Sequence, residues 1–449
     1  MPEQPIDVRT SNFDEVSLGY TEEMAVSEAM RCLNCRKHPC MDGCPAHNRI
    51  PDFIAQVAMG DFEAAYQILA ETTSLPAVCG RVCDQANQCE GNCVRGHKGE
   101  PVGIGRIEYF VADWHRAHAE KEEKPESNGT KVAVIGAGPA GLACADVLSG
   151  KGYDVTIYDS LDLAGGVVAY GIPEFVCPQS ITDAIASDLE EKGVKFVGGT
   201  TVGKDTKIAD MMSKDGYKAV FIGTGAETCT KMNVPGEDIP GVVNANEYLK
   251  KMSLDKIYEK DSDDPIKTAK KVAVIGGGNT AIDCARSAIR MGAETHIVYR
   301  RSLKEMPARA EEVVRAMDEG VDIQYLACPV EYIAGADGKV AKMNCVKMEL
   351  GEPDESGRRR PIPIEGSNYD IDVDLVVLAL GYTMDELITG TTDNLATDKW
   401  GNIPTGENGD TNLPGIFAGG DVVTGAKTVV HAMKAGRVAA DGIDEFLSK

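Results

Sequence analysis

Two stretches of this chain repeat one hydrophobic pattern. Residues 131–159 and 271–301 each open with the apolar run KVAVI, pass through a glycine-rich turn and a helix-like segment, and end in a second apolar run. A short apolar run that leads into a glycine turn and a helical period is typical of a buried strand followed by a crossover helix. The copies are displaced by 140 residues, which indicates either a duplicated nucleotide-binding unit or two separate occurrences of the same strand–turn–helix motif.

The flanking segments follow other patterns. Residues 51–72 place apolar side chains near every third or fourth position, which predicts helices, and no strand-like alternation stands out in residues 1–118. The charged and polar segment 119–130, with Pro125 and Gly129, predicts a linker. Residues 372–382 and 415–443 each predict a buried strand, and the second continues into a helix. We therefore expect the second unit to be inserted into the first, whose fold the C-terminal segment completes.

Charge narrows the classes of partner. Among the 449 residues, 70 acids against 46 bases give a formal charge of -24, which disfavours nucleic acid and anionic membranes. No apolar run reaches the roughly 18–20 residues of a membrane span, and the N-terminus lacks a signal-peptide pattern. We expect a cytoplasmic protein and, from charge alone, a protein partner with a basic docking face.

The first glycine motif is placed to bind a dinucleotide. Its first glycine forms a tight turn, its second lets the backbone approach a pyrophosphate, and its third allows close helix–strand packing, while the helix N-terminus supplies N–H donors. An acid 18 residues after the third glycine is placed to accept from a ribose hydroxyl. A glycine-rich turn in an unrelated α/β protein is the alternative. The predicted contacts are Gly136, Gly138, Pro139, Ala140, Gly141 and Asp159.

The second motif differs at its third glycine, replaced by Ala281, and at its second strand, which ends in two arginines. A carboxylate there would repel a 2′-phosphate, whereas guanidinium groups bind phosphate well. The pair favours NADP(H) over NAD(H); two solvated arginines at a strand end are the alternative. The predicted contacts are Gly276, Gly278, Asn279, Thr280, Arg300 and Arg301.

Two unlike dinucleotide sites in one chain indicate a resident flavin and an exchanging nicotinamide. In the segment GGDVV, Gly420 precedes Asp421, and an acid at the end of a terminal strand can hydrogen-bond a ribityl chain. The helix that begins near Lys427 and Thr428 can direct its N-terminal dipole at the flavin pyrimidine. A simple turn is the alternative for GGD.

Cysteine usage indicates metal. Eight of the 14 cysteines lie in one region, a density that disulfides do not explain in a reducing compartment. The first four have short gaps and a Cys-Pro ending, which resembles a bacterial ferredoxin run and does not suit structural zinc. Eight thiolates suffice for two 4Fe–4S clusters; zinc and free redox-sensing thiols are the alternatives. The candidate ligands are Cys32, Cys35, Cys40, Cys44, Cys79, Cys83, Cys89 and Cys93.

These features predict an α/β fold with two Rossmann-like FAD/NAD(P)-binding domains, the second inserted in the first, preceded by an α-helical iron–sulfur domain. The predicted domains are a helical domain with two 4Fe–4S clusters at 1–125, an FAD-binding domain at 130–245 plus 368–449, and an NADP(H)-binding domain at 246–367.

Nearly the whole chain resembles a known family, the small (β) subunit of NADPH-dependent glutamate synthase. Its relatives include the large subunit of NADH-dependent ferredoxin:NADP oxidoreductase and the N-terminal half of dihydropyrimidine dehydrogenase. The residues that carry the resemblance are CLNCRKHPCMDGCP, LPAVCGRVCDQANQCEGNC, GIGRIEYFVADW, AGGVVAYGIPEF, GGGNTAIDCAR, VYRRS and FAGGDVVTGA.

The resemblance implies further site residues. Gly165, Gly166 and the turn 170–173 would lie near the flavin of an FAD bound between the two domains. One cluster would be held by Cys32, Cys35, Cys40 and Cys93, and the other by Cys44, Cys83 and Cys89 with either Cys79 or Glu108 as the fourth ligand. The chain departs from the family after YGIPEF, where it has Val176 and Cys177 in place of a basic residue and a leucine.

The resemblance implies an NADPH-dependent iron–sulfur flavoprotein that exchanges hydride between NADP(H) and FAD and passes single electrons through the clusters to a partner. That partner would be a glutamate synthase large subunit, in an oligomer. One alternative is the large subunit of an electron-bifurcating transhydrogenase, whose partners are ferredoxin and a small flavoprotein; another is a non-catalytic electron-transfer or redox-sensing module. A disulfide reductase is disfavoured because the only CxxC, at Cys32 and Cys35, belongs to the cluster run.

Overall fold

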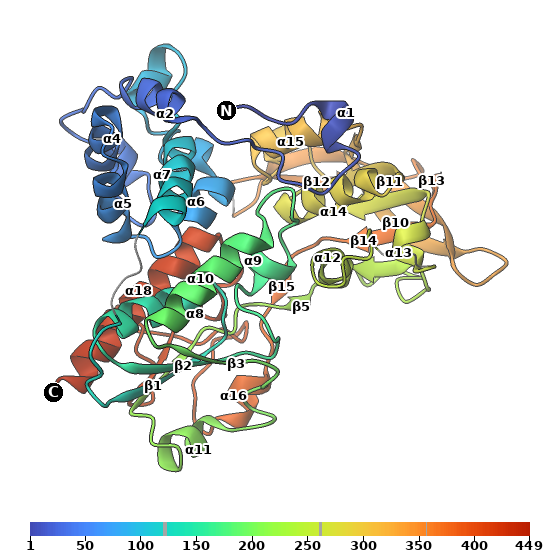
Figure 1. Cartoon of the computed structure of the whole chain (residues 1–449). Coiled ribbons are helices and arrows are strands. Elements are labelled where there is room, and N and C mark those ends of the chain that lie inside the picture. The colour runs from blue at the N-terminus through green and yellow to red at the C-terminus, as the bar shows by residue number, and fades with distance from the viewer. Residues whose placement is uncertain (120–123, 260–262, 356) are drawn as a thin grey trace.

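A computed structural model describes residues 1–119, 124–259, 263–355 and 357–449. Residues 1–119 form the helical unit, coloured blue to cyan in Figure 1. The apolar period is interrupted where Gly60 ends a helix at φ +80° and the Asp61 carboxylate accepts from the Ala64 N–H at 3.0 Å to start the next. The α-helices are α1 (Ile6–Arg9), α2 (Glu22–Ala29), α3 (Pro39–Asp42), α4 (Ile50–Met59), α5 (Phe62–Ala70), α6 (Pro76–Val82) and α7 (Ile104–His118).

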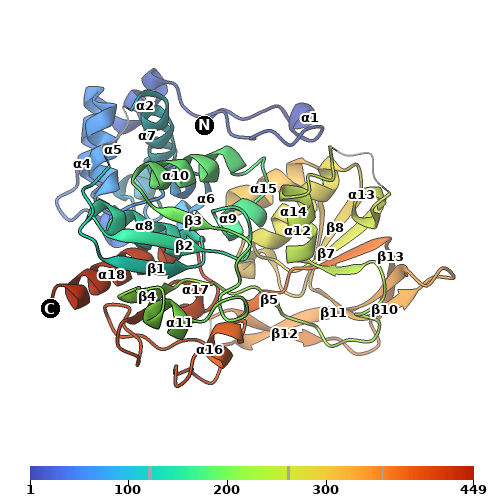
Figure 2. The ribbon, with the colours of Figure 1, turned by 60° about the horizontal axis from the view of Figure 1, so that its bottom comes forward.

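The first sheet is parallel throughout and has the order β16-β4-β1-β2-β3. Its strands are β1 (Lys131–Ile135), β2 (Asp154–Tyr158), β3 (Lys195–Val197), β4 (Ala219–Ile222) and β16 (Ile416–Ala418). Helices α8 and α18 pack together on one side of it, and Figure 2 shows the helical unit beyond them. The helices of this unit are α8 (Pro139–Gly150), α9 (Val167–Tyr170), α10 (Gln179–Glu191), α11 (Ile208–Ser213), α16 (Leu387–Thr391), α17 (Asp421–Thr424) and α18 (Val429–Leu447).

The second sheet is also parallel and has the order β6-β14-β7-β8-β9. Its strands are β6 (Val242–Asn244), β7 (Lys271–Ile275), β8 (Glu294–Tyr299), β9 (Asp322–Tyr325) and β14 (Leu375–Leu378), and its helices are α12 (Ala245–Ser253), α13 (Pro265–Thr268), α14 (Asn279–Arg290) and α15 (Ala310–Asp318). An antiparallel sheet adjoins it, formed by β10 (Ala327–Ala334), β11 (Val340–Pro353), β12 (Arg359–Pro363) and β13 (Tyr369–Asp372).

The second unit is inserted into the first, as the sequence predicts. The chain leaves the first sheet after β4, builds the second sheet, and returns to pair β16 with β4. The two crossings, β5 (Thr228–Cys229) and β15 (Tyr382–Thr383), pair with each other as an antiparallel ribbon. The exact division at 246–367 stays a prediction, and the pairing places β6 and β14, which flank that segment, in the second sheet.

One apolar core joins the helical unit to the first sheet. Phe53 and Ile107 of the helical unit belong to the same buried cluster as Val134 and Leu142, so these parts do not behave as separate globules. The predicted linker 119–130 includes residues 120–123, which lie outside the described residues. Among the described residues, no helix combines the length and apolar character that a membrane span requires.

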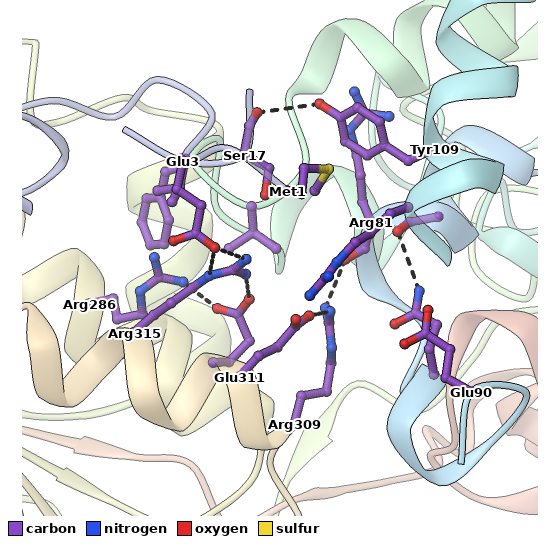
Figure 3. A pocket seen from close by; sticks show the side chains of 17 residues that line it. Met1, Glu3, Ser17, Arg81, Glu90, Tyr109, Arg286, Arg309, Glu311 and Arg315 are labelled. Carbon is purple, nitrogen blue, oxygen red and sulfur yellow. Dashed lines mark hydrogen bonds and ion pairs between the residues drawn. The ribbon is translucent and has the colours of Figure 1, made fainter. Parts of the chain in front are cut away.

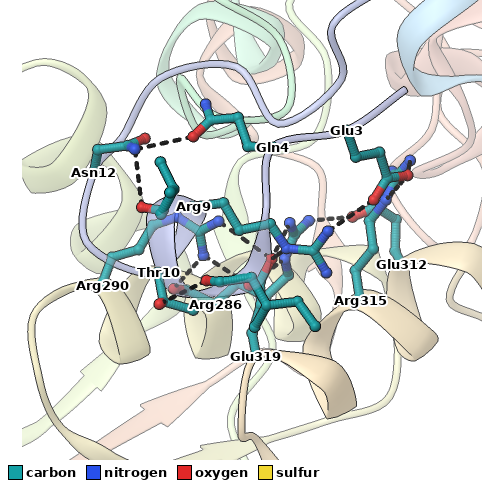
Figure 4. Close-up of polar contacts among 12 residues, drawn as sticks. Glu3, Gln4, Arg9, Thr10, Asn12, Arg286, Arg290, Glu312, Arg315 and Glu319 are labelled. Carbon is teal, nitrogen blue, oxygen red and sulfur yellow. Dashed lines mark hydrogen bonds and ion pairs between the residues drawn. The ribbon is translucent and has the colours of Figure 1, made fainter. Parts of the chain in front are cut away.

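The N-terminal segment, residues 1–17, crosses from the helical unit to α14 and α15 (Figure 4). Arg9 lies 3.0 Å from the Glu319 carboxylate, and Arg286 and Arg290 both donate hydrogen bonds to the same carboxylate at 2.7–2.9 Å. All four side chains are buried. Although burial alone would raise it, the hydrogen bonds from Arg286 and Arg290 hold the pKa of Glu319 to about 2. This carboxylate therefore pairs with three guanidinium groups at once, two of which have a second carboxylate partner.

Replacing that carboxylate should destabilise the chain strongly. We expect Glu319→Gln to lower the free energy of unfolding by about 3–5 kcal/mol at pH 7, because it leaves the buried Arg290 guanidinium without its carboxylate partner. Urea unfolding followed by circular dichroism measures the loss. Because folding lowers the pKa of Glu319, its contribution is present above the unfolded pKa near 4.3 and disappears as pH falls towards 2, so the difference should shrink across that window.

The matched control is Glu294→Gln, at an exposed carboxylate 3.4 Å from His296. It should cost less than about 1 kcal/mol. Equal losses in the two variants would contradict the assignment.

Candidate cofactor sites

The first glycine turn joins β1 to α8, and its close contacts explain two of its glycines. Gly136 has φ +97°, and a Cβ there would lie 2.5 Å from the Gly223 carbonyl oxygen. A Cβ at Gly141 would lie 1.8 Å from the Gly136 carbonyl oxygen. Gly138 is different, because a Cβ there would meet only the Gly166 Cα, at 4.0 Å. The turn therefore leaves open space at Gly138, at the N-terminus of a 12-residue helix, where a dinucleotide pyrophosphate would fit.

Asp159 follows β2 and reaches this turn. Its carboxylate accepts from the Ala137 N–H at 2.7 Å and from the Leu161 N–H at 2.8 Å. Burial raises the pKa of Asp159, and these two backbone hydrogen bonds oppose the shift. Each oxygen keeps a free lone pair, so the carboxylate can also accept from a ribose hydroxyl.

The loop before α9 folds over the turn. Gly165 has φ +115° and donates its N–H to the Ala137 carbonyl at 2.8 Å. Gly166 has φ +53°, and a Cβ there would lie 2.7 Å from the Gly138 Cα. The backbone at Gly166 thus approaches the turn more closely than a side chain would allow, while Gly165 contacts the turn through its N–H.

The C-terminal segment completes this site. A Cβ at Gly420, which has φ +81°, would lie 2.9 Å from the Ala140 Cβ, so β16 and α17 meet the start of α8. Asp421 accepts from the Lys427 N–H at 3.2 Å, and burial raises the pKa of Asp421 to about 6. Thr428 precedes α18, and its hydroxyl pairs with the His431 Nδ1 at 2.7 Å. Segments almost 300 residues apart therefore converge on one cradle.

The second glycine turn repeats this geometry between β7 and α14. Gly276 has φ +145°, and a Cβ there would lie 2.3 Å from the Ala379 carbonyl oxygen, whereas a Cβ at Gly278 would meet nothing within 4 Å. The Asn279 side chain accepts from the Arg309 N–H at 2.9 Å, and Thr280 contacts Tyr382 of β15. This turn also leaves room for a pyrophosphate.

The two arginines after β8 have different environments. Arg300 is exposed, whereas Arg301 is buried and engaged elsewhere. The Arg301 guanidinium donates to the Arg359 carbonyl at 2.8 Å and to the Asp354 carboxylate at 2.6 Å. The structure thus leaves Arg300 as the accessible candidate for a phosphate contact and gives Arg301 a role in holding the β11–β12 hairpin.

The eight clustered cysteines separate into two sets. The outer set is half-buried and lines one hollow with Ile54 and Val102; it comprises Cys32, Cys35, Cys40 and Cys93. The inner set is buried and comprises Cys44, Cys79, Cys83 and Cys89. The structure therefore pairs Cys93 with the first run and removes Cys44 from it, which is the exchange implied by the resemblance.

Glu108 of α7 lies within electrostatic reach of the inner set. Its side chain is buried, its Oε1 has no hydrogen-bond partner in the described part of the chain, and burial raises its pKa to about 8. Burial likewise raises the pKa of Cys44 to about 11, with Glu108 and Cys83 adding to the shift. Buried thiols and a buried carboxyl group with raised pKa values fit a metal site, because a bound metal would supply the positive charge that stabilises their ionised forms.

Across residues 1–119, 124–259, 263–355 and 357–449, no three His, Cys, Asp or Glu side chains converge on a single-ion position. Iron–sulfur clusters bind thiolates around a larger framework, so both sets fit that class of cofactor.

Sequence patterns did not reveal the role of Arg309. Its guanidinium donates to the Arg81 carbonyl at 2.8 Å, 228 residues away, beside a cavity of about 50 Å³ (Figure 3). Its charge acts on Cys83, while Cys177 of the first nucleotide unit acts on Cys79. The inner set therefore borders both nucleotide units, and Arg309 links it to the second glycine turn. An arginine with no local motif gives no signal for such a contact.

Comparisons with known proteins agree with this organisation. Residues 9–120 match the family model described as dihydropyrimidine dehydrogenase domain II, 4Fe-4S cluster. Residues 130–436 match the model described as pyridine nucleotide-disulphide oxidoreductase. The structure of Mycobacterium tuberculosis FprA in complex with NADPH is similar in fold, with a TM-score of 0.57, 20% identity, and coverage of 71% of this chain and 85% of that chain.

Two curated relatives differ in how much of their own length this chain covers. It is 36% identical to the small chain of glutamate synthase (NADPH) from Azospirillum brasilense, over 99% of this chain and 94% of the relative. It is 40% identical to the beta subunit of the NADP(+)-dependent formate dehydrogenase of Moorella thermoacetica, over 91% of this chain, but it spans only 60% of that subunit. The chain thus belongs to the family of glutamate synthase small chains, the iron–sulfur flavoprotein oxidoreductases that use pyridine nucleotides.

Proposed function

We propose that this chain is the electron-input subunit of a larger enzyme of the glutamate synthase (NADPH) type. It would take hydride from NADPH at the second glycine turn and deliver single electrons to a large partner subunit. The observation that carries the proposal is the burial order of the cysteines. The inner set borders both nucleotide units, whereas the outer set is half-exposed at the far side of the helical unit. That order supports an electron path from the nucleotide units outwards.

The chain's own residues would position the two nucleotides. When bound, FAD and the nicotinamide supply the hydride chemistry, and the clusters supply one-electron transfer. Tyr170, beside the flavin-side glycines, donates to Glu227 at 3.1 Å, and Lys250 of α12 lies 4.5 Å from the Tyr170 ring centre. Asn246 donates to the Glu227 carbonyl at 3.0 Å. These contacts cross from the first unit to the second, so they would help to hold the two turns in one relative orientation.

The inner ligand set favours Glu108 over Cys79 as the fourth ligand. Glu108 carries the orphaned buried oxygen, and a carboxylate that lacks a partner gains most from a bound metal. Asp421 and Asp159 would bind the ribityl and ribose hydroxyls of FAD, and Arg300 would bind the 2′-phosphate of NADPH.

Alanine substitutions at Gly138 and Gly278, where the turns leave open space, test the two nucleotide sites separately. Gly138→Ala adds a methyl group to empty space, so the chain should fold, but binding of FAD should weaken about tenfold or more because the methyl group occupies the pyrophosphate position. Gly278→Ala should do the same to NADPH while FAD content stays normal. FAD released per chain and NADPH titrations measure both.

The control is Gly150→Ala, because a Cβ at Gly150 also meets nothing within 4 Å but lies at the far end of α8. Loss of FAD from the Gly150 variant, or its full retention by the Gly138 variant, would contradict the site.

Nucleotide preference tests the direction of electron input. Mixed anaerobically with the reconstituted chain, NADPH should bleach the flavin much faster than NADH in stopped-flow absorbance. Arg300→Ala should weaken NADPH binding about 10- to 100-fold and leave NADH unchanged, since it removes a charge-assisted hydrogen bond to the 2′-phosphate. The exposed Lys304 provides the control, Lys304→Ala. Equal bleaching by both nucleotides in the unmodified chain would reject the NADPH assignment.

Iron content tests the fourth inner ligand. Glu108→Ala should lose the inner cluster and lower iron from about eight towards about four atoms per chain. Cys79→Ser, which keeps the buried volume, should retain both clusters. The opposite pattern, seen by iron analysis and low-temperature EPR, would assign the ligand to Cys79.

A further inference from the structure

The surface around the outer cysteine set has a charge opposite to that of the chain as a whole. Residues 30–41 and 93–99 contain five Arg or Lys residues and no Asp or Glu, with the exposed Asp42 and Glu100 directly after them, although acids outnumber bases 70 to 46 over the full sequence. The two loops lie together, since Arg95 donates to the Arg31 carbonyl at 3.2 Å. The acidic balance of the sequence, which suggested a partner with a basic face, therefore does not describe this location.

Three of these cations are unengaged. Arg31 donates to Glu28 and to the Pro101 carbonyl, and Arg95 is held by Arg31, so both are used within the fold. Arg36, Lys37 and Lys98 are exposed and form no ion pair with the part of the chain that the structure describes. Their charges are free to meet a partner.

Apolar side chains accompany these cations. Met30 is 68% exposed, Leu33 57% and Val94 38%, and Leu33 and Val94 line the same hollow as the outer thiols. Exposed apolar groups that lie beside unpaired charges of one sign are characteristic of a protein contact. We name this surface the basic rim; it comprises Met30, Leu33, Arg36, Lys37, Val94 and Lys98.

We propose that the basic rim docks an acidic electron-transfer protein or subunit, whose own redox centre would come to lie opposite the outer cysteine set. This inference rests on the proposed function, because it takes the outer set as the exit for electrons. Complementary charge would speed the encounter, and the apolar side chains would hold the contact once water is expelled.

The size of the rim favours a compact protein over an extended polyanion. Beyond the rim the surface returns to net negative charge, and charges interact over only about 10 Å at 0.1 M salt. A nucleic acid or an anionic membrane would extend past the rim onto repelling surface, whereas a small acidic protein would not.

The test uses the chain loaded with FAD and clusters, and a small acidic ferredoxin as the probe. The triple variant Arg36→Glu, Lys37→Glu, Lys98→Glu should weaken ferredoxin binding at least tenfold at 50 mM NaCl, measured by biolayer interferometry. Binding to the unmodified chain should weaken steeply as salt rises. The control triple Lys207→Glu, Lys339→Glu, Lys399→Glu makes the same charge change at exposed positions outside the helical unit and should change the affinity less than threefold.

Three outcomes would overturn the proposal. In the first, both triple variants lose ferredoxin binding equally; in the second, the unmodified chain binds a basic cytochrome c as tightly as it binds ferredoxin. In the third, the rim variant loses binding to phosphatidylserine vesicles, or loses self-association, while its affinity for ferredoxin is unchanged. Flavin bleaching by NADPH and iron content are measured on the same preparations. If NADPH fails to bleach the flavin of the unmodified chain, the proposed function fails; if bleaching is normal but the rim variant still binds ferredoxin fully, only the docking surface is wrong.

Discussion

Arg9, Arg286 and Arg290 share the carboxylate of Glu319 at the place where the N-terminal segment crosses α14 and α15. Charges buried to this extent are tolerated only when each has a partner in the right place. The N-terminal segment and the second unit must therefore keep one relative position, since a shift of either would break this buried contact. Arg309 extends the same constraint from the second glycine turn to Arg81, next to the inner thiols. The spacing of the cofactor sites depends on this junction.

The two glycine turns show how one backbone solution serves two purposes. In both turns, a Cβ at the first glycine would clash with a carbonyl oxygen just after a neighbouring strand, whereas the second glycine faces open space. They differ in what approaches from outside. The loop at Gly165 and the segment at Gly420 close over the first turn, as suits a resident nucleotide. The second turn has the exposed Arg300 nearby, as suits a nucleotide that exchanges.

The two cysteine sets of the helical unit differ in burial and in the surface that surrounds them. The inner thiols share an apolar core with the first sheet, and the outer thiols lie where the chain is basic and partly apolar at its surface. A low-dielectric interior strengthens the influence of each nearby charge on a buried centre, whereas the exposed centre is tuned mainly by solvent and by whatever docks there.

Local spacing was sufficient to predict the duplicated nucleotide units, the insertion of one into the other, and the helical cysteine-rich region, because strand, turn and helix signals are short-range. The closeness of Gly138 to Gly166, the separation of Arg300 from Arg301, and the placement of Cys93 with the first cysteine run could not be deduced from spacing. Each depends on contacts between segments far apart in the chain, where packing and charge compensation choose among arrangements that the linear pattern permits equally. The charge of the whole chain likewise gave the opposite sign to the rim around the outer thiols, because net charge is a sum over the sequence whereas docking depends on the few side chains that folding brings together.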